Sequence, residues 1–283
     1  MSTLTTLKEL LRRLPNYLKA FGPIAGLRLC MSMERAAPVR SDRLRAWHVP
    51  GYDAPIHLRE ALGDHATFFQ CIVRDQYAFD GFSQGRQLLD DYHALVKAGK
   101  KPLIIDGGGN IGLSTLWFGR LMPAARIVVV EPDERNLAVL RRNVAILGNR
   151  VTVVQGGVWD RPTRLHIVNP DSGSAAFRVE ELPVDAEGGL RAYSVDELCT
   201  IGGGGDPFIV KLDIEGAQVQ VFRSGTDWTQ RTRLIALELD DWLMPWKGTS
   251  RPFFSALAPQ PYDYLIGGEA IFCFRDPKQT PAG

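Results

Sequence analysis

The chain has 283 residues, of which 45% are hydrophobic and 23% are charged, as in a typical soluble globular protein. The net charge of +1 gives no indication of nucleic-acid binding, and no apolar run reaches the ~18 residues that span a bilayer. The four cysteines form no Cys-x-x-Cys pair, which argues against a zinc site or a disulfide framework. Because no secretory signal is recognisable either, we expect a cytoplasmic protein with free thiols.

Positive charge is concentrated near the N-terminus, where residues 1–60 hold ten Lys or Arg and five Asp or Glu. Within residues 1–18, leucines at helical spacing alternate with Lys8, Arg12 and Arg13. Such a helix either packs on its own domain with a solvated basic face or binds a membrane surface or a partner. Prolines interrupt the rest of residues 1–85, which show no catalytic pattern. We therefore predict an N-terminal appendage of helices and short strands at 1–85.

From residue 86 onward, apolar strand patterns alternate with amphipathic helix patterns. Strands are predicted at 101–105, 126–130, 151–155, 208–212 and 233–239, and helices at 85–98, 110–122, 134–147, 193–200 and 217–224. Two hairpins are predicted, 165–168 with 176–179 and 262–266 with 270–274, and the second adds an antiparallel edge strand. This alternation predicts an α/β fold with a parallel sheet covered on both faces, and it places one domain at 86–283.

The most informative stretch follows the first of these strands. Asp106 ends the strand, and four glycines then surround Asn110, as expected where a ligand approaches the backbone closely. Three of them, at 107, 109 and 112, also match the Gly-x-Gly-x-x-Gly pattern of dinucleotide sites. Glu131 follows Gly112 by 19 residues, the spacing of an acid that binds ribose hydroxyls. The alternative for Glu131 is an acid that favours the next helix N-terminus.

Charge separates the two cofactors that fit this turn, a nicotinamide dinucleotide and S-adenosylmethionine. An acid at Asp106 repels a pyrophosphate, but it suits the cationic ammonium and sulfonium groups of S-adenosylmethionine. A second strand delivers Lys211, Asp213 and Glu215 to the same edge of the sheet. This cluster favours a cationic group or a metal over a hydride-transfer site. The alternative for it is a solvated strand end that caps the following helix.

These residues resemble the FkbM-type family of S-adenosylmethionine-dependent methyltransferases. The glycine turn matches the family pattern Asp-x-Gly-Ala-Asn-x-Gly, with Gly109 in place of Ala. Further matches in the family order are Glu131-Pro132-Asp133, Arg142-Asn143, Gly157-Val158-Trp159-Asp160, Ser194-Val195-Asp196-Glu197-Leu198 and Lys211-Leu212-Asp213-Ile214-Glu215-Gly216. The resemblance covers roughly residues 85–275.

The resemblance implies a Rossmann-like class I methyltransferase fold, with a mostly parallel seven-stranded sheet and an antiparallel last strand. It implies S-adenosylmethionine as the cofactor, bound by Asp106, Gly108, Asn110, Gly112, Glu131, Asp160 and Asp213. The implied reaction is methyl transfer, most often to a hydroxyl of a sugar, a glycan or a secondary metabolite. The expected partner is such a small-molecule or glycan acceptor.

A hydroxyl nucleophile also needs a base that accepts its proton. Family members often have an acid followed by His after the fifth strand, but here Asp240 and Asp241 follow Glu238, so a His base is unsupported. The candidate bases are Asp213, Glu238, Asp240 and Asp241, and we assign catalysis to Asp213, Glu238 and Asp241. We assign no metal ligands; the alternative is a divalent ion held by Asp213 with Glu238 or Asp241.

Three further side chains have open interpretations. His166 is either a base that reaches over the site or a structural residue of the hairpin. Trp242 and Trp246 either form a platform that stacks on a sugar or pack a loop onto the sheet. Two other functions compete with methyl transfer, a nicotinamide-dependent oxidoreductase and a non-enzymatic domain that kept the cofactor fold.

Overall fold

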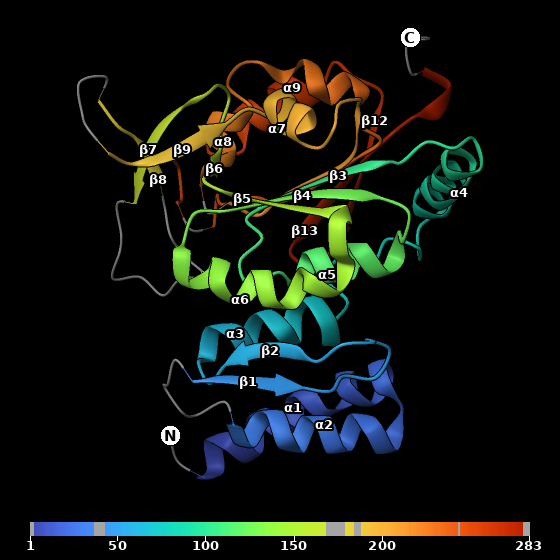
Figure 1. The fold of residues 1–283 in the computed structure, drawn as a ribbon, viewed down its shortest axis with the longest axis vertical. Helices are drawn as coiled ribbons and strands as arrows, with labels where there is room; N and C mark the ends of the chain where they lie inside the picture. Colours follow the sequence, from blue (N-terminus) through green and yellow to red (C-terminus); the bar gives the residue numbers. More distant parts are fainter. Residues whose placement is uncertain are drawn as a thin grey trace.

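The computed structural model describes residues 3–36, 43–167, 179–183, 188–214, 216–242 and 244–279. A central twisted sheet has helices on both faces, and the N-terminal elements form an additional block beneath one helical layer (Figure 1). Of the positions discussed above, residues 1–2, 168 and 176–178 and Glu215 lie outside the described part of the chain.

The central sheet has seven strands in the order β12-β13-β11-β10-β3-β4-β5. Their bounds are β3 Leu103–Gly107, β4 Arg126–Glu131, β5 Val151–Gln155, β10 Pro207–Leu212, β11 Leu234–Glu238, β12 Tyr262–Gly267 and β13 Ala270–Arg275. Strand β13 runs antiparallel to both of its neighbours, β11 and β12, as predicted for the last strand. The terminal hairpin supplies the edge strand, as predicted; this strand is β12, because β13 inserts between β11 and β12. This is the arrangement of a class I methyltransferase fold.

Both faces of the sheet are buried, as the near-continuous apolar strands predict. Successive residues of a strand point to opposite faces, so Ile104 belongs to one hydrophobic cluster and Ile105 to the other. The helices and short helical turns of this domain are α4 Ser83–Lys97, α5 Leu113–Leu121, α6 Glu134–Val144, η2 Ala145–Arg150, α7 Val195–Ile201, α8 Gln218–Val221, η3 Thr226–Arg231, α9 Arg251–Leu257 and η4 Pro277–Gln279. In Figure 1, α5 and α6 cover one face while α7, α8 and α9 cover the other.

The helix boundaries follow from local capping. Asp133 accepts a hydrogen bond from the Asn136 N–H and so begins α6, and Ser194 accepts one from the Glu197 N–H and begins α7. The helix predicted from residue 110 begins at Leu113 instead. Gly112, just before it, adopts a left-handed conformation with φ of 85°, which residues with a side chain rarely adopt.

A smaller sheet lies beside the main one, in the order β6-β9-β7-β8. Its strands are β6 Gly157–Val158, β7 Thr163–Ile167, β8 Val179–Glu181 and β9 Leu190–Tyr193. Strands β7 and β8 pair antiparallel, with Ile167 opposite Val179; residues 168 and 176–178 of the predicted hairpin lie outside the described residues. Neither β6 nor β9 follows from the sequence pattern.

The N-terminal elements pack closely against the sheet domain. They are α1 Thr3–Phe21, α2 Pro23–Ala36, β1 Leu44–Trp47, β2 Ile56–Arg59, α3 Leu62–Phe68 and the π-helical turn η1 Phe69–Val73. Tyr17 of α1 and Phe68 of α3 belong to the same hydrophobic cluster as Ile104 of β3. Helix α1 therefore packs on its own chain, although Leu11 on its surface is exposed. No helix of the described residues is long and apolar enough to cross a membrane.

Candidate active site

A cavity of about 480 Å³ opens at the carboxyl edge of the sheet. The turn after β3 lines it with Gly108 and Asn110, the end of β10 with Asp213, and the end of β11 with Glu238. Ligands of open α/β sheets bind at this edge, and the volume is in the range of small-molecule sites. The structure thus brings four of the predicted site residues together around one cavity.

The glycine turn is built for close backbone contact. A Cβ atom on Gly108 would lie 1.8 Å from the backbone oxygen of Asp213, and the residue has φ of +75°. The N–H groups of Gly108 and Gly109 both donate to the carbonyl of Val130 on β4. Only glycine fits at 108, because a side chain there would push apart the turn and the end of β10.

Gly112 has a different role, since it does not line the cavity. A Cβ atom there would lie 3.0 Å from Val144 and 3.2 Å from Leu140 of α6. Its left-handed conformation lets α5 begin close against α6. In the structure Gly112 positions the N-terminus of α5, and its predicted contact with the cofactor stays a prediction.

Asp106 lies beneath the cavity and is fully buried. Its Oδ1 lies 3.0 Å from the Nζ of Lys211, and its Oδ2 accepts hydrogen bonds from the hydroxyls of Ser114 and Thr115 on α5. Lys211 also donates to the carbonyls of Gly107 and Gly108. Asp106 thus ties α5 and the glycine turn to β10, and its negative charge is neutralised by Lys211 instead of facing the cavity.

The protonation state of Lys211 follows from the same contacts. Its side chain is only 1% exposed, and burial alone lowers the pKa of an amine. The carboxylates of Asp106 and Asp213 outweigh this effect, so that the pKa of Lys211 is raised above its ordinary value. Lys211 is therefore a permanently charged counterion and cannot act as a base.

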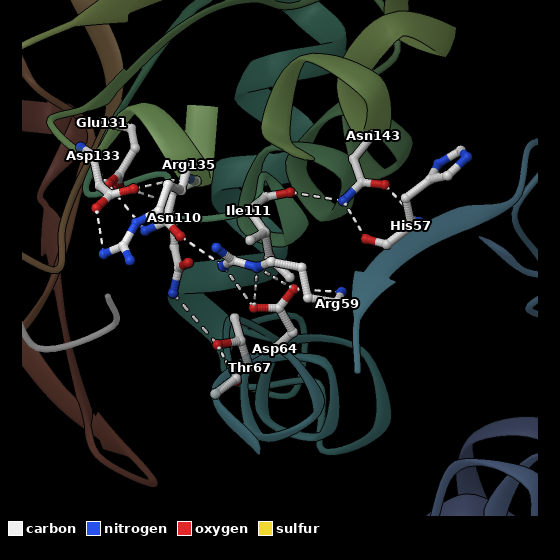
Figure 2. A network of polar contacts seen from close by, with 12 residues as sticks. His57, Arg59, Asp64, Thr67, Asn110, Ile111, Glu131, Asp133, Arg135 and Asn143 are labelled. Carbon is white, nitrogen blue, oxygen red and sulfur yellow. Dashed lines mark hydrogen bonds and ion pairs between the residues drawn. The ribbon is translucent and has the colours of Figure 1, made fainter. Parts of the chain in front are cut away.

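Glu131 at the end of β4 lies behind the glycine turn (Figure 2). Its Oε2 accepts a hydrogen bond of 2.8 Å from the Asn110 N–H, and its Oε1 accepts from the Asp133 N–H and from the Asn136 side chain. Burial raises the pKa of Glu131 to about 7, although these hydrogen bonds act in the opposite direction. A carboxylate offers about four acceptor positions, so a ribose hydroxyl would have to share Oε2 with Asn110.

Asp213 presents its carboxylate to the cavity, with 40% of its side chain exposed. The Tyr77 hydroxyl donates a hydrogen bond of 3.3 Å to Oδ2 of Asp213, and the Nζ of Lys211 lies 3.8 Å from the same oxygen. Burial, followed by the nearby charge of Asp213, raises the pKa of Tyr77 well above its ordinary value. Tyr77 is therefore a neutral donor that orients the carboxylate at physiological pH.

The remaining candidate bases on β11 and after it separate in space. Glu238 lines the cavity. Asp240 is buried, and its Oδ2 accepts a hydrogen bond of 2.8 Å from the Gly216 N–H; burial raises its pKa. Asp241 is half-buried and does not line the cavity. The structure therefore groups Glu238 with Asp213 and leaves Asp241 outside.

Asp160 and His166 also lie away from the cavity. Asp160 follows β6, where its carboxylate accepts hydrogen bonds from the Ser224 hydroxyl and from Arg161. His166 is a residue of β7 in the small sheet. The position of His166 on β7, away from the cavity, favours its structural interpretation. The carboxylate of Asp160 bonds to neighbouring side chains.

The two tryptophans after β11 are not packed onto the sheet. Trp242 is 71% exposed and lines the cavity, and Trp246 is fully exposed. An indole ring left in water at the rim of a site is available to stack on a ligand.

One wall of the cavity comes from a segment in which the sequence showed no catalytic pattern. Thr67 on α3, Gln70 and Cys71 on η1, and Gln76 and Tyr77 after it all line the cavity. π-Helical turns are rare and occur frequently at functional sites, but hydrophobic periodicity does not reveal them. The density of polar and aromatic residues from Gln70 to Tyr77 is the only signal in the sequence.

Polar contacts fix this segment against the domain that carries the glycine turn. Arg59 is buried and pairs with Asp64 at 2.7 Å, and it also donates to the side-chain oxygen of Asn136 on α6. The Asn110 side chain reaches the Thr67 hydroxyl at 3.4 Å. Figure 2 shows these bonds linking β2 and α3 to the turn and to α6. The N-terminal segment is thus attached directly beside the site.

The charges around the cavity fit S-adenosylmethionine. The carboxylates of Asp213, Glu238 and Glu269 line the cavity, and the only cation among the described lining residues is Lys211, already neutralised by Asp106. This excess of negative charge suits the ammonium and the sulfonium, while the N-terminus of α5 suits the carboxylate of the same molecule. No group of three His, Cys, Asp or Glu within the described residues is arranged to hold a metal ion.

Comparison with known proteins gives an independent result. The family described as "Methyltransferase FkbM domain" matches residues 106–246. The 2-O-methyltransferase NoeI of Sinorhizobium fredii (strain NBRC 101917 / NGR234) is 26% identical over 156 residues, which are 50% of this chain and 64% of NoeI. The match thus spans less than two thirds of that relative.

Similar solved structures include two methyltransferases. The precorrin-6y C5,15-methyltransferase of Geobacter metallireducens GS-15 is 11% identical with a TM-score of 0.35, covering 67% of this chain and 88% of its own. The O-methyltransferase of Bacillus cereus in complex with SAH is 16% identical with a TM-score of 0.37, covering 67% of this chain and 81% of its own.

The family match begins at Asp106 and includes the glycine turn, Glu131, Asp213 and Glu238. It removes the two competing functions, the nicotinamide-dependent oxidoreductase and the non-enzymatic domain. The chain belongs to the FkbM family of S-adenosylmethionine-dependent methyltransferases.

Proposed function

We propose that this enzyme methylates a hydroxyl group on a sugar, a glycan or a secondary metabolite. The observation that carries the proposal is the carboxylate of Asp213, which faces the cavity while Tyr77 and Lys211 hold it from behind. A carboxylate in this position is suited to accept the proton of a hydroxyl nucleophile.

On the donor side, we assign binding of S-adenosylmethionine to the glycine turn and its neighbours. Gly108 and Asn110 line the cavity directly, and Glu131 would receive the ribose through its shared Oε2. The Asp213 and Glu238 carboxylates supply the negative charge that a cationic donor needs. When bound, S-adenosylmethionine supplies an activated methyl group with a neutral sulfide as the leaving group.

On the acceptor side, the protein aligns the nucleophile and removes its proton. Asp213 accepts the proton, and Tyr77 keeps its carboxylate oriented through a hydrogen bond. Glu238 lines the same cavity and is assigned to bind a second hydroxyl of the acceptor. Alignment of the reacting groups is a large part of catalysis when the leaving group is already good.

Two observations favour a saccharide among possible acceptors. Trp242 offers an exposed indole face at the rim of the cavity, which is the arrangement that binds the apolar face of a sugar ring. The name of the relative NoeI, a 2-O-methyltransferase, supports a hydroxyl acceptor in general. The acidic lining at Asp213, Glu238 and Glu269 also provides acceptors for sugar hydroxyl donors.

The test is methyl transfer by the purified full chain from S-adenosylmethionine carrying a labelled methyl group. Acceptors would include monosaccharides, oligosaccharides and phenolic metabolites, together with amines and thiols of similar size. We expect label on a hydroxyl oxygen, located by fragmentation mass spectrometry. Asp213→Asn should lower turnover by roughly 100-fold or more while leaving the dissociation constant for S-adenosylhomocysteine within a few fold.

Asp91 provides a matched control, since this acid on α4 bonds to Arg233 far from the cavity. Asp91→Asn should retain turnover. Label found only on nitrogen or sulfur, or unchanged turnover in Asp213→Asn, contradicts the proposal.

A further inference from the structure

A second cavity, of about 780 Å³, lies next to the candidate active site. It is bounded by the C-terminal end of α1, by the loop with Tyr52, by α5 and by the residues that follow η1. A small cavity of about 140 Å³ lies between the two, because it shares Gln70, Gln76 and Glu269 with the first and Arg74 and Asp75 with the second. The three cavities thus follow one another along a single segment.

This segment has an unusual backbone, and its residues line all three cavities, with Arg74 and Asp75 at both the small and the second cavity. It begins with the π-helical turn η1 and continues to Asp75, which has φ of 56° although it is not glycine. Arg74 and Asp75 line the second cavity, and Tyr77 lines the first. Backbone strain of this kind persists where the surrounding structure holds it, often at ligand sites.

The second cavity has more cations than acids. Lys19, Arg74 and Arg120 line it together with Asp75 and Asp80. None of the three cations forms an ion pair with a described residue. The carboxylate of Asp75, by contrast, accepts a hydrogen bond from the Trp117 indole.

The position of Arg120 is fixed by packing. Its guanidinium lies 5.1 Å from the centre of the Tyr52 ring and forms a side-chain hydrogen bond with Tyr52, so Arg120 is held at the wall of the second cavity. Guanidinium groups bind oxyanions through paired, charge-assisted hydrogen bonds.

We propose that this second cavity binds an oxyanion on the acceptor, such as a phosphate, a sulfate or a carboxylate, through Arg74 and Arg120. The inference rests on the proposed function, because it treats the occupant as the far end of the molecule that is methylated. Arg74 and Tyr77 are three positions apart in the sequence, a backbone span of at most roughly 11 Å. An anionic sugar or a short anionic oligosaccharide bridges such a distance, with its hydroxyl at Asp213 and its charge at Arg74.

The experiment measures binding of small probes to the full chain saturated with S-adenosylhomocysteine, by isothermal titration calorimetry. The probes are glucose 1-phosphate, glucose 6-sulfate, glucuronic acid and neutral glucose. We expect at least one anionic probe to bind roughly tenfold or more tightly than glucose, with affinity that falls as salt is added. The ranking of the three anions identifies the oxyanion that the site prefers.

Variants locate the binding. Arg74→Ala and Arg120→Ala should each weaken binding of the anionic probe by roughly tenfold. The affinities for glucose and for S-adenosylhomocysteine should stay unchanged. Arg74→Lys, which keeps the charge, should retain part of the affinity. Arg223→Ala removes an exposed arginine on the other side of the sheet, whose hydrogen bond goes to Gln220, and should change nothing. Thermal unfolding of each variant establishes that it is folded.

Equal affinity for glucose and all anions, or a preference that survives in Arg74→Ala and Arg120→Ala, overturns the inference. These outcomes are distinct from a failure of the proposed function. If anions bind through Arg74 and Arg120 but no hydroxyl is ever methylated, the proposed reaction fails. If hydroxyls are methylated without any charge preference, only the oxyanion site fails.

Discussion

The Tyr77 hydroxyl donates a hydrogen bond to the Asp213 carboxylate across 136 positions of the sequence. Tyr77 belongs to the N-terminal segment, and Asp213 to the end of a central strand. The bond therefore joins the N-terminal segment to the sheet domain, and both residues line the same cavity.

Tyr77→Phe tests whether this bond positions the proposed base. The ring keeps its packing against Phe118, so only the hydroxyl is lost. We expect kcat to fall by roughly tenfold, because an unaligned carboxylate accepts the proton less efficiently, while the affinity for S-adenosylhomocysteine is retained. A fall in cofactor affinity as large as the fall in kcat would instead assign Tyr77 a purely structural role.

The catalytic assignment also includes Glu238 and Asp241, and the structure predicts which of the two matters more for turnover. Glu238 lines the cavity and Asp241 does not, so Glu238→Gln should lower kcat/KM for the acceptor by roughly tenfold or more. Asp241→Asn should stay within about twofold of the parent enzyme. Steady-state kinetics on both variants decides the matter, and the reverse order would remove Glu238 from the site.

The buried pair of Lys211 and Asp106 predicts a stability effect. In Lys211→Met, the Asp106 carboxylate stays buried without its counterion, which costs about 3 to 5 kcal/mol. Urea denaturation measures this loss. The double variant Asp106→Asn/Lys211→Met, which buries no charge, should recover a large part of it; a double variant no more stable than Lys211→Met would show that charge compensation is not the cause.

Glu131 predicts how stability depends on pH. Its pKa is about 7 in the folded protein against an ordinary value of 4.5, so between these pH values the folded state holds a proton that the unfolded state has released. The stabilisation of the folded state by this bound proton is complete below about pH 4.5 and is lost as the pH rises through 7. The difference corresponds to roughly 3 kcal/mol.

The corresponding measurement compares the parent protein with Glu131→Gln in urea denaturation series between pH 4.5 and 8, without cofactor. The free energy of unfolding of the parent should decline more steeply with pH than that of the variant. If the two curves run parallel, the pKa of Glu131 in the folded protein lies near its ordinary value, because the three hydrogen bonds compensate for the effect of burial.

The elements that the sequence predicts well are those determined by local patterns. The strand that ends at Asp106, the glycine turn and the spacing to Glu131 all follow from apolar runs and turn residues within a few positions. The cavity wall from Thr67 to Tyr77 does not, because its contacts with Asn110 and Asp213 are long-range. The hydrophobic periodicity of a segment carries no information about its contacts with residues more than forty positions away.

Side-chain direction explains the other differences. Lys211 and Asp213 were expected at the same edge of the sheet, and they are there. Lys211, however, still lies within β10, opposite Asp106 of β3 in the strand register, and so contacts that buried carboxylate. This contact depends on the sheet order, which pairs β10 with β3. The inner position of β13 likewise depends on how the last hairpin docks against β11.

The cavity wall from Thr67 to Tyr77 lies outside residues 106–246, the part of the chain that matches the family. Part of the wall that we propose to contact the acceptor is therefore encoded outside the stretch that matches the family, while Glu238 and Trp242 lie within it. Under the proposed function, substitutions between Thr67 and Asp80 change the choice of acceptor while the sequence of the glycine turn stays the same. Exchange of this segment between relatives is then one route by which evolution, or an engineer, redirects such an enzyme.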